Sequence, residues 1–277
     1  MYSINLQVIL IWIAITFYVV STCLYLFGII MKKDSLVRKA PIAGLVGYLP
    51  QTVAIVLRWI ETGHFPYWGT YEVFSAYSWG TVTIFLGAKL LNRKLSIAGV
   101  VVFPLAFFMA GMALTGSKEI QEIPGTFLTY WLVIHIIFAN LAAAAGLIAA
   151  TFSGFYLINK KKKAAGGAVY QPKWMPNPEQ ADQDAYRWSI LAFICMSIMI
   201  GSGSVWAYSA WGRYWGWDPI ETWSLISWFI YAILLHLRST LGWRGSKSAW
   251  LTIAALFIVV FSYFLIPFIY GTVHEHL

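Results

Sequence analysis

Charged residues are scarce in this sequence. Only 11% of the 277 residues are Asp, Glu, Lys or Arg, whereas 60% are hydrophobic and the mean hydropathy is +0.69. A soluble domain carries about a quarter charged residues. The composition therefore excludes a soluble globular protein and predicts a chain embedded in a lipid bilayer. The net charge of +8 does not indicate nucleic-acid binding, because the basic residues lie in short segments between apolar runs.

Cysteine is also scarce. Cys23 and Cys195 are the two cysteines, and both sit inside apolar segments. They form no CxxC or CxxCH motif, so the sequence supports neither a thiol–disulfide pair nor covalent haem attachment to this chain. We interpret both as buried apolar side chains.

Long polar segments are absent as well. The most extended one, residues 159–186, is short and rich in Pro, Gly and charge, which is typical of a linker. We therefore expect a single transmembrane domain over residues 1–277. Any activity of the protein is expected to take place in or at the bilayer.

What the sequence does contain is a series of long apolar runs, each sufficient for a membrane-spanning helix. They predict an all-α polytopic bundle of about eight transmembrane helices. The first is expected to be a retained span and not a cleaved signal, because it is too long and lacks a small-residue cleavage site. The eight segments are 6–31, 41–60, 71–91, 95–115, 126–158, 187–208, 219–238 and 249–270.

The basic residues predict the orientation of this bundle. Sixteen of the 19 lie in alternate connections, near residues 32–40, 89–94, 159–187 and 238–248, while Arg58, Lys118 and Arg213 remain on the other side. Cytoplasmic loops carry the excess of Lys and Arg. Both termini and the remaining connections, near residues 61–70, 116–125 and 209–218, are therefore expected on the outer side.

One outward connection is unusually rich in tryptophan. Residues 211–228 read WGRYWGWDPIETWSLISW, and six of the 15 tryptophans fall between residues 206 and 228. Asp218 is suited to be a helix N-cap, with Pro219 at the first position and Glu221 completing a capping box. The tryptophans could form an interfacial aromatic belt. Alternatively they could hold a planar ligand with carboxylate tails, such as haem, whose carboxylate Arg213 would bind.

The histidines offer candidate ligands for a metal. His135 and His236 lie within predicted spans, where an ionisable residue suggests a function. His135 is expected near the outer surface, as is His274, and the two could ligate one iron from opposite faces. His236 lies 18 residues after Asp218, about 27 Å along a helix, and so belongs near the inner surface. Hydrogen-bonded packing residues, or an ordinary tail histidine for His274, are the alternatives.

These segments together resemble a known family. The string WGRYWGWDPIETWSLISW resembles the tryptophan-rich WWD signature of haem-handling membrane proteins, in particular the CcsA/ResC family of System II cytochrome c biogenesis. Further resemblances are the LHLR and GWRGSKSAW segments, TGHFPYWGTYEVF, and the helix TYWLVIHIIFANLAA. The matches extend over roughly residues 59 to 276.

The resemblance implies a cytochrome c synthase, or haem lyase, subunit. With a ResB/CcsB-type membrane partner it would carry haem b outward across the membrane and present it to the CxxCH of an apocytochrome c for thioether attachment. Because the thiols must be reduced, a thiol-reducing protein is also implied. The expected location is the bacterial cytoplasmic membrane or the thylakoid membrane.

The resemblance also implies roles for single residues. His135 and His274 would be the axial ligands of an outer haem, and His236 would be one ligand of an inner haem. That haem's second ligand would come from the partner. Arg213 as a propionate ligand is an inference from its chemistry alone. The remaining residues expected to line the outer haem, in the WWD loop at about 206–228, are Trp211, Trp215, Trp217, Asp218 and Trp223.

Two departures from the family pattern leave alternatives open. The chain ends in YGTVHEHL where the family has a segment like GxGLHSYG, so His276 remains an alternative to His274. The TYE segment lacks the family's asparagine, and His64 nearby is interpreted as a surface histidine.

Three other functions remain to be distinguished. A CcmC-like protein would deliver haem without attaching it, but that branch resembles a six-helix protein with a WDxRLTS-type continuation. A haem-retaining membrane cytochrome would favour histidine pairs at both depths. An uncharacterised transporter would use the tryptophans only as a belt.

Overall fold

The computed structural model describes residues 2–120, 122–165, 174–262 and 266–269, and these residues are helices and their connections, without strands. This confirms the predicted all-α class. The helices are α1 (Tyr2–Ile30), α2 (Asp34–Thr62), α3 (Gly69–Leu91), the 3-10 turn η1 (Arg93–Ala98), α4 (Gly99–Thr115), the 3-10 turn η2 (Gly125–Phe127), α5 (Tyr130–Ala164), α6 (Pro178–Trp211), α7 (Pro219–Thr240), α8 (Ser246–Val260) and α9 (Ile266–Ile269).

The eight predicted spans correspond to α1 to α8. Among the described residues, six helices are long and apolar enough to cross a membrane, namely α1, α2, α4 with part of η1, α5, α6 and α7. Helix α3 has 23 residues, but its Ser, Thr and Tyr side chains dilute its apolar character. Helix α8 is apolar and shorter, with 15 residues.

The chain divides into two compact units. One contains α1 to α4, and the other contains η2 and α5 to α9. We call them the N-terminal unit and the C-terminal unit. The expectation of a single domain rested on the lack of a soluble module, and it stays a prediction.

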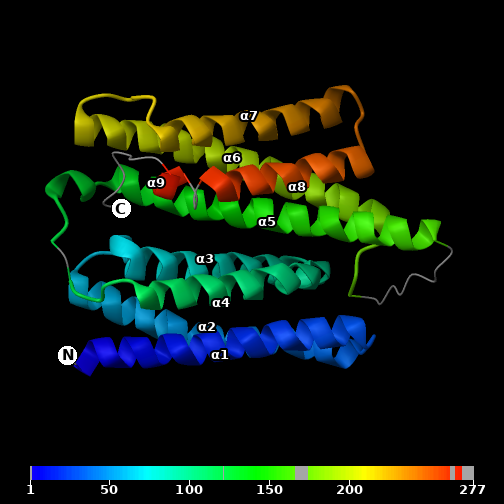
Figure 1. Ribbon diagram of the computed structural model, residues 1–277, viewed down its shortest axis with the longest axis horizontal. Coiled ribbons are helices and arrows are strands. Elements are labelled where there is room, and N and C mark those ends of the chain that lie inside the picture. Colours follow the sequence, from blue (N-terminus) through cyan, green and yellow to red (C-terminus); the bar gives the residue numbers. More distant parts are fainter. Residues whose placement is uncertain (1, 121, 166–173, 263–265, 270–277) are drawn as a thin grey trace. The chain divides into compact units, whose positions relative to one another are not determined.

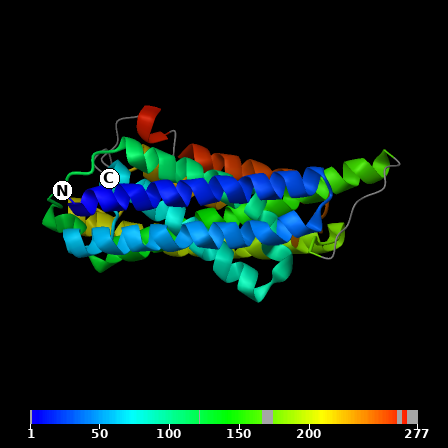
Figure 2. The same ribbon diagram turned by 90° about the horizontal axis from the view of Figure 1, so that it is seen from below.

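The N-terminal unit is built from antiparallel helices. Helices α1 and α2 lie side by side along their length in Figure 1 and Figure 2, and α3 packs on α4. Buried aromatic side chains fill the space between them. The ring of Phe103 on α4 is surrounded by three other aromatic rings. Its centroid lies 5.7 Å from that of Tyr18, 6.1 Å from that of Tyr25 and 5.4 Å from that of Phe85.

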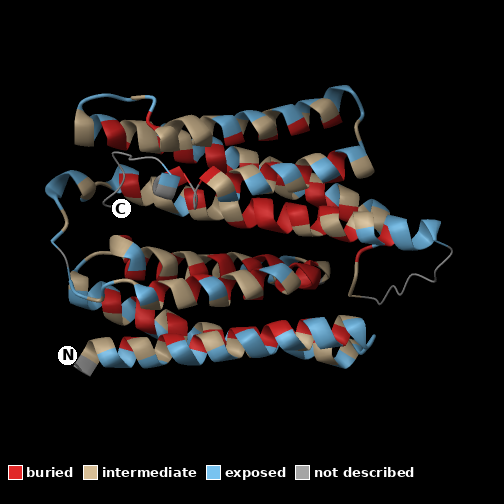
Figure 3. Cartoon of the chain, in the orientation of Figure 1, coloured by how far each residue is buried: buried red, intermediate tan, exposed pale blue. Residues whose placement is uncertain are grey.

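The C-terminal unit is centred on α5. Its middle, residues 142–150, is mostly buried and consists largely of alanine and glycine, which lets α6 and α8 approach closely (Figure 3). Helix α5 has 35 residues, about 50 Å at 1.5 Å per residue, which is more than the hydrocarbon thickness of a bilayer. Its exposed, lysine-rich C-terminal end extends beyond α7 and α8 (Figure 1).

Both long connections of this unit end in capping boxes. Asn177 and Gln180 cap α6, and Asp218 and Glu221 cap α7, each followed by a proline in the first turn. The predicted start of α7 at Asp218 is therefore confirmed. The cap places the tryptophan-rich connection between the C-terminal end of α6 and the N-terminal end of α7.

Candidate functional site

The connection between α6 and α7, residues 212–218, is held in shape by one carboxylate. Oε2 of Glu221 accepts hydrogen bonds from the backbone N–H groups of Gly216, at 2.7 Å, and of Asp218, at 3.3 Å. Oδ1 of Asp218 accepts in turn from the backbone N–H of Ile220 at 2.9 Å. The first turn of α7 therefore fixes the loop that precedes it (Figure 1).

The backbone of Trp217 is strained within this loop. Its φ is +57°, in the left-handed region, which costs residues other than glycine about 1–2 kcal/mol. The indole of Trp217 is nevertheless 70% exposed. Strain of this kind is found at binding and active sites. An exposed indole on a strained backbone therefore suggests a ligand-binding surface.

The tryptophans of the segment divide into a buried anchor and an open surface. Trp206 is buried, donates from Nε1 to the carbonyl of Thr126 at 3.3 Å, and packs edge-to-face on Trp211 with 4.9 Å between ring centroids. Trp215 and Trp217 pack edge-to-face at 5.8 Å. Trp223 lies 4.8 Å from Phe261.

One polar atom in this surface has no acceptor. Nε1 of Trp215 is buried and makes no hydrogen bond within the described part of the chain. A buried N–H without a partner costs about 1–3 kcal/mol. An acceptor brought by a ligand, such as a carboxylate oxygen, would remove that cost.

Arg213 extends an exposed guanidinium over the same loop. It lies against Gly216, where a Cβ atom would stand 2.7 Å from Nε of the arginine, so a larger residue there would displace the flexible guanidinium. Among the described residues Arg213 makes no ion pair. A charged fork beside flat aromatic surface fits a planar ligand that carries carboxylates.

His135 on α5 lies at the same end of the C-terminal unit. Its ring centroid is 6.4 Å from that of Trp206, which connects it to the tryptophan segment. Nδ1 lies 2.8 Å from the backbone carbonyl of Met199 on α6. Because a carbonyl only accepts, Nδ1 carries the proton, and the lone pair that could ligate a metal is on Nε2.

Gly203 on α6 makes room for this imidazole. A Cβ atom at position 203 would stand 2.6 Å from Nδ1 and 2.9 Å from Cε1 of His135. Close approach of α5 and α6 at this point is therefore possible only with glycine. The histidine is fixed in position by Met199 and Gly203 together.

Another predicted histidine ligand, His236, is not brought to this end. His236 is exposed near the C-terminal end of α7, with Nδ1 at 3.4 Å from Oγ1 of Thr240. It is thus at the opposite end of the helix from Asp218. His274 and its alternative His276 lie outside the described residues. Within the described residues, no group of three or more His, Cys, Asp or Glu side chains could hold a metal ion.

The N-terminal unit contains a buried ion pair that the sequence analysis did not predict. Arg58 and Glu72, 4% and 3% exposed, are joined by a 2.7 Å bond from Nε to Oε1. Oε2 of Glu72 also accepts from the backbone N–H groups of Tyr67, at 3.2 Å, and Trp68, at 3.1 Å. The pKa of Tyr67 is raised, mainly by burial and to a smaller extent by the negative charge of Glu72, so this phenol stays neutral at physiological pH.

The sequence carried a signal for this pair. Arg58 interrupts an apolar span, and a charge at such a position needs a partner. The pair fixes the short connection after α2, in which the ring of His64 lies 5.2 Å from that of Tyr67.

Comparison with known proteins agrees with this fold. Residues 67–274 match the family described as Cytochrome C assembly protein. The "Cytochrome c biogenesis protein CcsA" of Prochlorococcus marinus strain NATL1A is 32% identical over 241 residues, which cover 76% of each chain. The protein of that name from strain AS9601 is 30% identical over 274 residues, covering 90% of this chain and 87% of its own.

A solved structure shares the fold. "Cytochrome c Heme Lyase CcmF" aligns with 94% of this chain at a TM-score of 0.68 and 15% identity, and the chain spans 46% of the length of that protein. With its long apolar helices and its similarity to these proteins, the chain is an integral protein of the cytoplasmic or thylakoid membrane with a role in cytochrome c assembly. The predicted resemblance is confirmed, and the chain belongs to the cytochrome c assembly protein family.

Proposed function

We propose that this protein is the haem lyase subunit of a cytochrome c synthase. It moves haem b across the membrane and presents it at the outer end of the C-terminal unit for attachment to the CxxCH of apocytochrome c. The main support for the proposal is that His135 packs next to Trp206, which in turn packs against Trp211 in the tryptophan segment. One candidate iron ligand and one aromatic surface from different helices are thereby joined in a single site.

The residues present fit haem. Nε2 of His135 would ligate the iron, and His274 is the proposed second ligand. The indole rings of Trp215, Trp217 and Trp223 would cover the porphyrin face. Arg213 and the unpartnered Nε1 of Trp215 would bind propionate oxygens. Trp211 and Asp218 would complete the lining.

The protein's part in the reaction is chiefly to position the reactants. Each thioether bond forms when a cysteine S–H adds across a vinyl C=C of haem, with sulfur joining one carbon and the proton the other. No oxidant is consumed. Holding the vinyl edge against the docked CxxCH supplies most of the acceleration. A thiol-reducing protein would keep the cysteines reactive.

Entry of haem from the cytoplasmic side is assigned to the opposite end of the unit. His236 is the proposed ligand of an inner haem, with its second ligand from a ResB/CcsB-type partner. The exposure of His236 is compatible with a ligand that is shared between two chains.

The experiment that tests this function is a spectrum combined with a maturation assay. The chain, purified with and without its partner, is expected to show a haem Soret band, and His135→Ala is expected to lose the outer haem and cytochrome c maturation. His64→Ala, which changes an outward histidine of the N-terminal unit, is the control. Absence of the Soret band from both preparations would contradict the proposal. Bound haem without thioether formation would instead indicate a CcmC-like delivery protein.

A further inference from the structure

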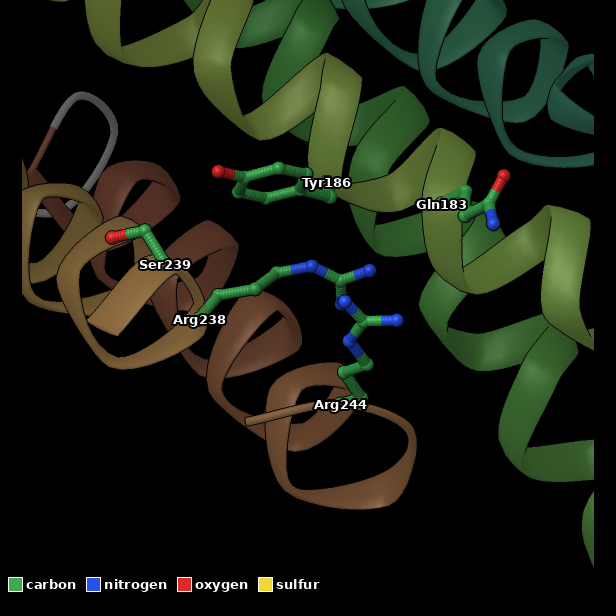
Figure 4. Close-up of a pocket in the computed structure, with 5 residues that line it drawn as sticks. All are labelled: Gln183, Tyr186, Arg238, Ser239 and Arg244. Carbon is green, nitrogen blue, oxygen red and sulfur yellow. The ribbon is translucent and has the colours of Figure 1, made fainter. Parts of the chain in front are cut away.

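A polar cavity lies at the end of the C-terminal unit opposite the tryptophan segment, where the basic residues predict the cytoplasmic side. Its volume is about 260 Å³. Gln183 and Tyr186 on α6, Arg238 and Ser239 on α7, and Arg244 in the connection to α8 line it (Figure 4). We call it the inner pocket. It is separate from the tryptophan segment.

Arg238 forms a rigid wall of the inner pocket. Nη1 and Nη2 donate to the two carboxylate oxygens of Asp182 at 2.9 and 2.7 Å, and Nη1 also donates to Oγ of Ser248 at 3.1 Å. The guanidinium carbon lies 4.6 Å from the centre of the Tyr186 ring, and the side chain is 7% exposed. Three of its five donor positions are thus used. Nε–H and one Nη2–H remain for a ligand.

Arg244 brings a second positive charge to the same place. Arg244 and Arg238 both line the inner pocket (Figure 4). Arg244 is exposed and makes no hydrogen bond within the described chain, whereas the backbone N–H of its neighbour Gly245 donates to Asp182 at 2.9 Å. Asp182 therefore positions both the Arg238 side chain and the backbone next to Arg244.

The charges at the inner pocket do not cancel. Asp182 offsets one guanidinium, so a positive charge remains, and Lys160, whose Nζ donates to Oγ of Ser246 at 2.8 Å, adds another close to the same connection. Two other acidic side chains lie on this part of α6: Asp184 is paired with Arg187, and Glu179, in the first turn, does not line the pocket. Two guanidinium groups that line one pocket attract an anion more strongly than either group would alone.

We propose that the inner pocket binds the oxyanion of a membrane amphiphile, either the phosphate of an anionic phospholipid or a propionate carboxylate of haem. Guanidinium groups form paired hydrogen bonds with both oxyanions. The amide of Gln183 lines the same pocket, whereas the Ser239 hydroxyl donates to the backbone carbonyl of His236 at 3.3 Å. Basic pockets between helices on the cytoplasmic side are suited to lipid head groups. Binding of a haem propionate here rests on the function proposed above, in which His236, three residues before Ser239, ligates an inner haem. Binding of a phospholipid phosphate does not depend on that function.

The lipid source is tested on the whole protein in nanodiscs by native mass spectrometry. Binding of phosphatidylglycerol, relative to phosphatidylcholine, is compared among the unchanged chain, Arg244→Gln and Arg187→Gln. Arg187 is the matched control, since it lies on the same part of α6 with a 72% exposed side chain and does not line the pocket. Arg244→Gln is expected to weaken phosphatidylglycerol binding roughly tenfold, and Arg187→Gln to leave it unchanged.

The haem source is tested in nanodiscs of phosphatidylcholine alone, by titration with haem and with haem dimethyl ester, which lacks free carboxylates. The variants are made in a His135→Ala background, because the outer site is expected to lose its haem there. If the pocket binds a propionate, this background prefers haem roughly tenfold, and adding Arg244→Gln removes the preference. Arg187→Gln keeps it. A change in either assay supports the proposal and identifies the source. If Arg244→Gln equals Arg187→Gln in both, the pocket is not an oxyanion site, and the outer haem site remains testable through His135.

Discussion

At the scale of single residues, the outer site depends on how closely α5 and α6 approach. His135 is oriented by a carbonyl on one side and by a glycine on the other. Sequence patterns could single out His135, because a histidine in a membrane span is rare. They could not single out Met199 or Gly203, since a backbone carbonyl and an absent side chain leave no signal in one sequence.

Gly203→Ala is expected to displace the His135 imidazole and weaken outer haem binding about tenfold or more. The added methyl group would overlap the ring, which can move only by breaking its bond to the Met199 carbonyl. Gly201→Ala is the control, because a Cβ atom there meets no atom within 4 Å. Titration of the purified variants with haem, followed at the Soret band, measures the effect. Equal affinities for the two variants would rule out the role assigned to Gly203.

Replacing Trp215 is expected to change protein stability and haem affinity in opposite directions, because its buried N–H has no hydrogen-bond partner in the described part of the chain. Trp215→Phe removes a donor without a partner, so the haem-free protein is expected to keep or gain stability, by about 1–3 kcal/mol. Haem affinity is expected to fall. Trp206→Phe, which removes a donor bonded to Thr126, is expected to lower stability instead. Thermal unfolding and haem titration of both variants measure this, and a loss of stability in Trp215→Phe would contradict it.

At the scale of elements, the start of α7 is the part of the fold that the sequence predicted best. Asp218, Pro219 and Glu221 are a local pattern, and local patterns can be recognised without knowledge of the tertiary fold. The same reasoning did not reach Arg58 and Glu72, whose pairing joins α2 to α3 across 14 positions of sequence. The predicted eighth span, 249–270, corresponds to α8 and α9, and residues 263–265 and 270 within it lie outside the described residues.

Glu221→Ala is expected to affect the tryptophan loop more than the helix that carries the mutation. The helix loses part of a cap, worth about 1 kcal/mol, but the loop loses the acceptor of both the Gly216 and Asp218 N–H groups. Haem affinity is therefore expected to fall well beyond the change in stability. Gln180→Ala removes the matching position of the α6 capping box and is the control. A similar loss of haem in both variants would indicate a general loss of stability.

At the scale of the whole molecule, the outer and inner sites of the C-terminal unit are defined by the asymmetry of basic residues. Sixteen of 19 basic residues predict which ends are cytoplasmic. The proposed function needs this orientation, since apocytochrome c is met outside and haem enters from inside.

Cysteine labelling tests the orientation directly. In a chain whose two native cysteines, Cys23 and Cys195, are replaced by serine, one cysteine is introduced at Tyr214 in the tryptophan loop, 56% exposed, or at Leu241 after α7, 62% exposed. In right-side-out membrane vesicles, a membrane-impermeant maleimide is expected to label Tyr214→Cys at once and Leu241→Cys only after the vesicles are opened. Because the two positions are similarly exposed in the structure, a difference in labelling reports the membrane barrier and not burial. The reverse pattern would place the tryptophan loop in the cytoplasm, where it could not present haem to an external apocytochrome, and would reject the proposed function together with the topology.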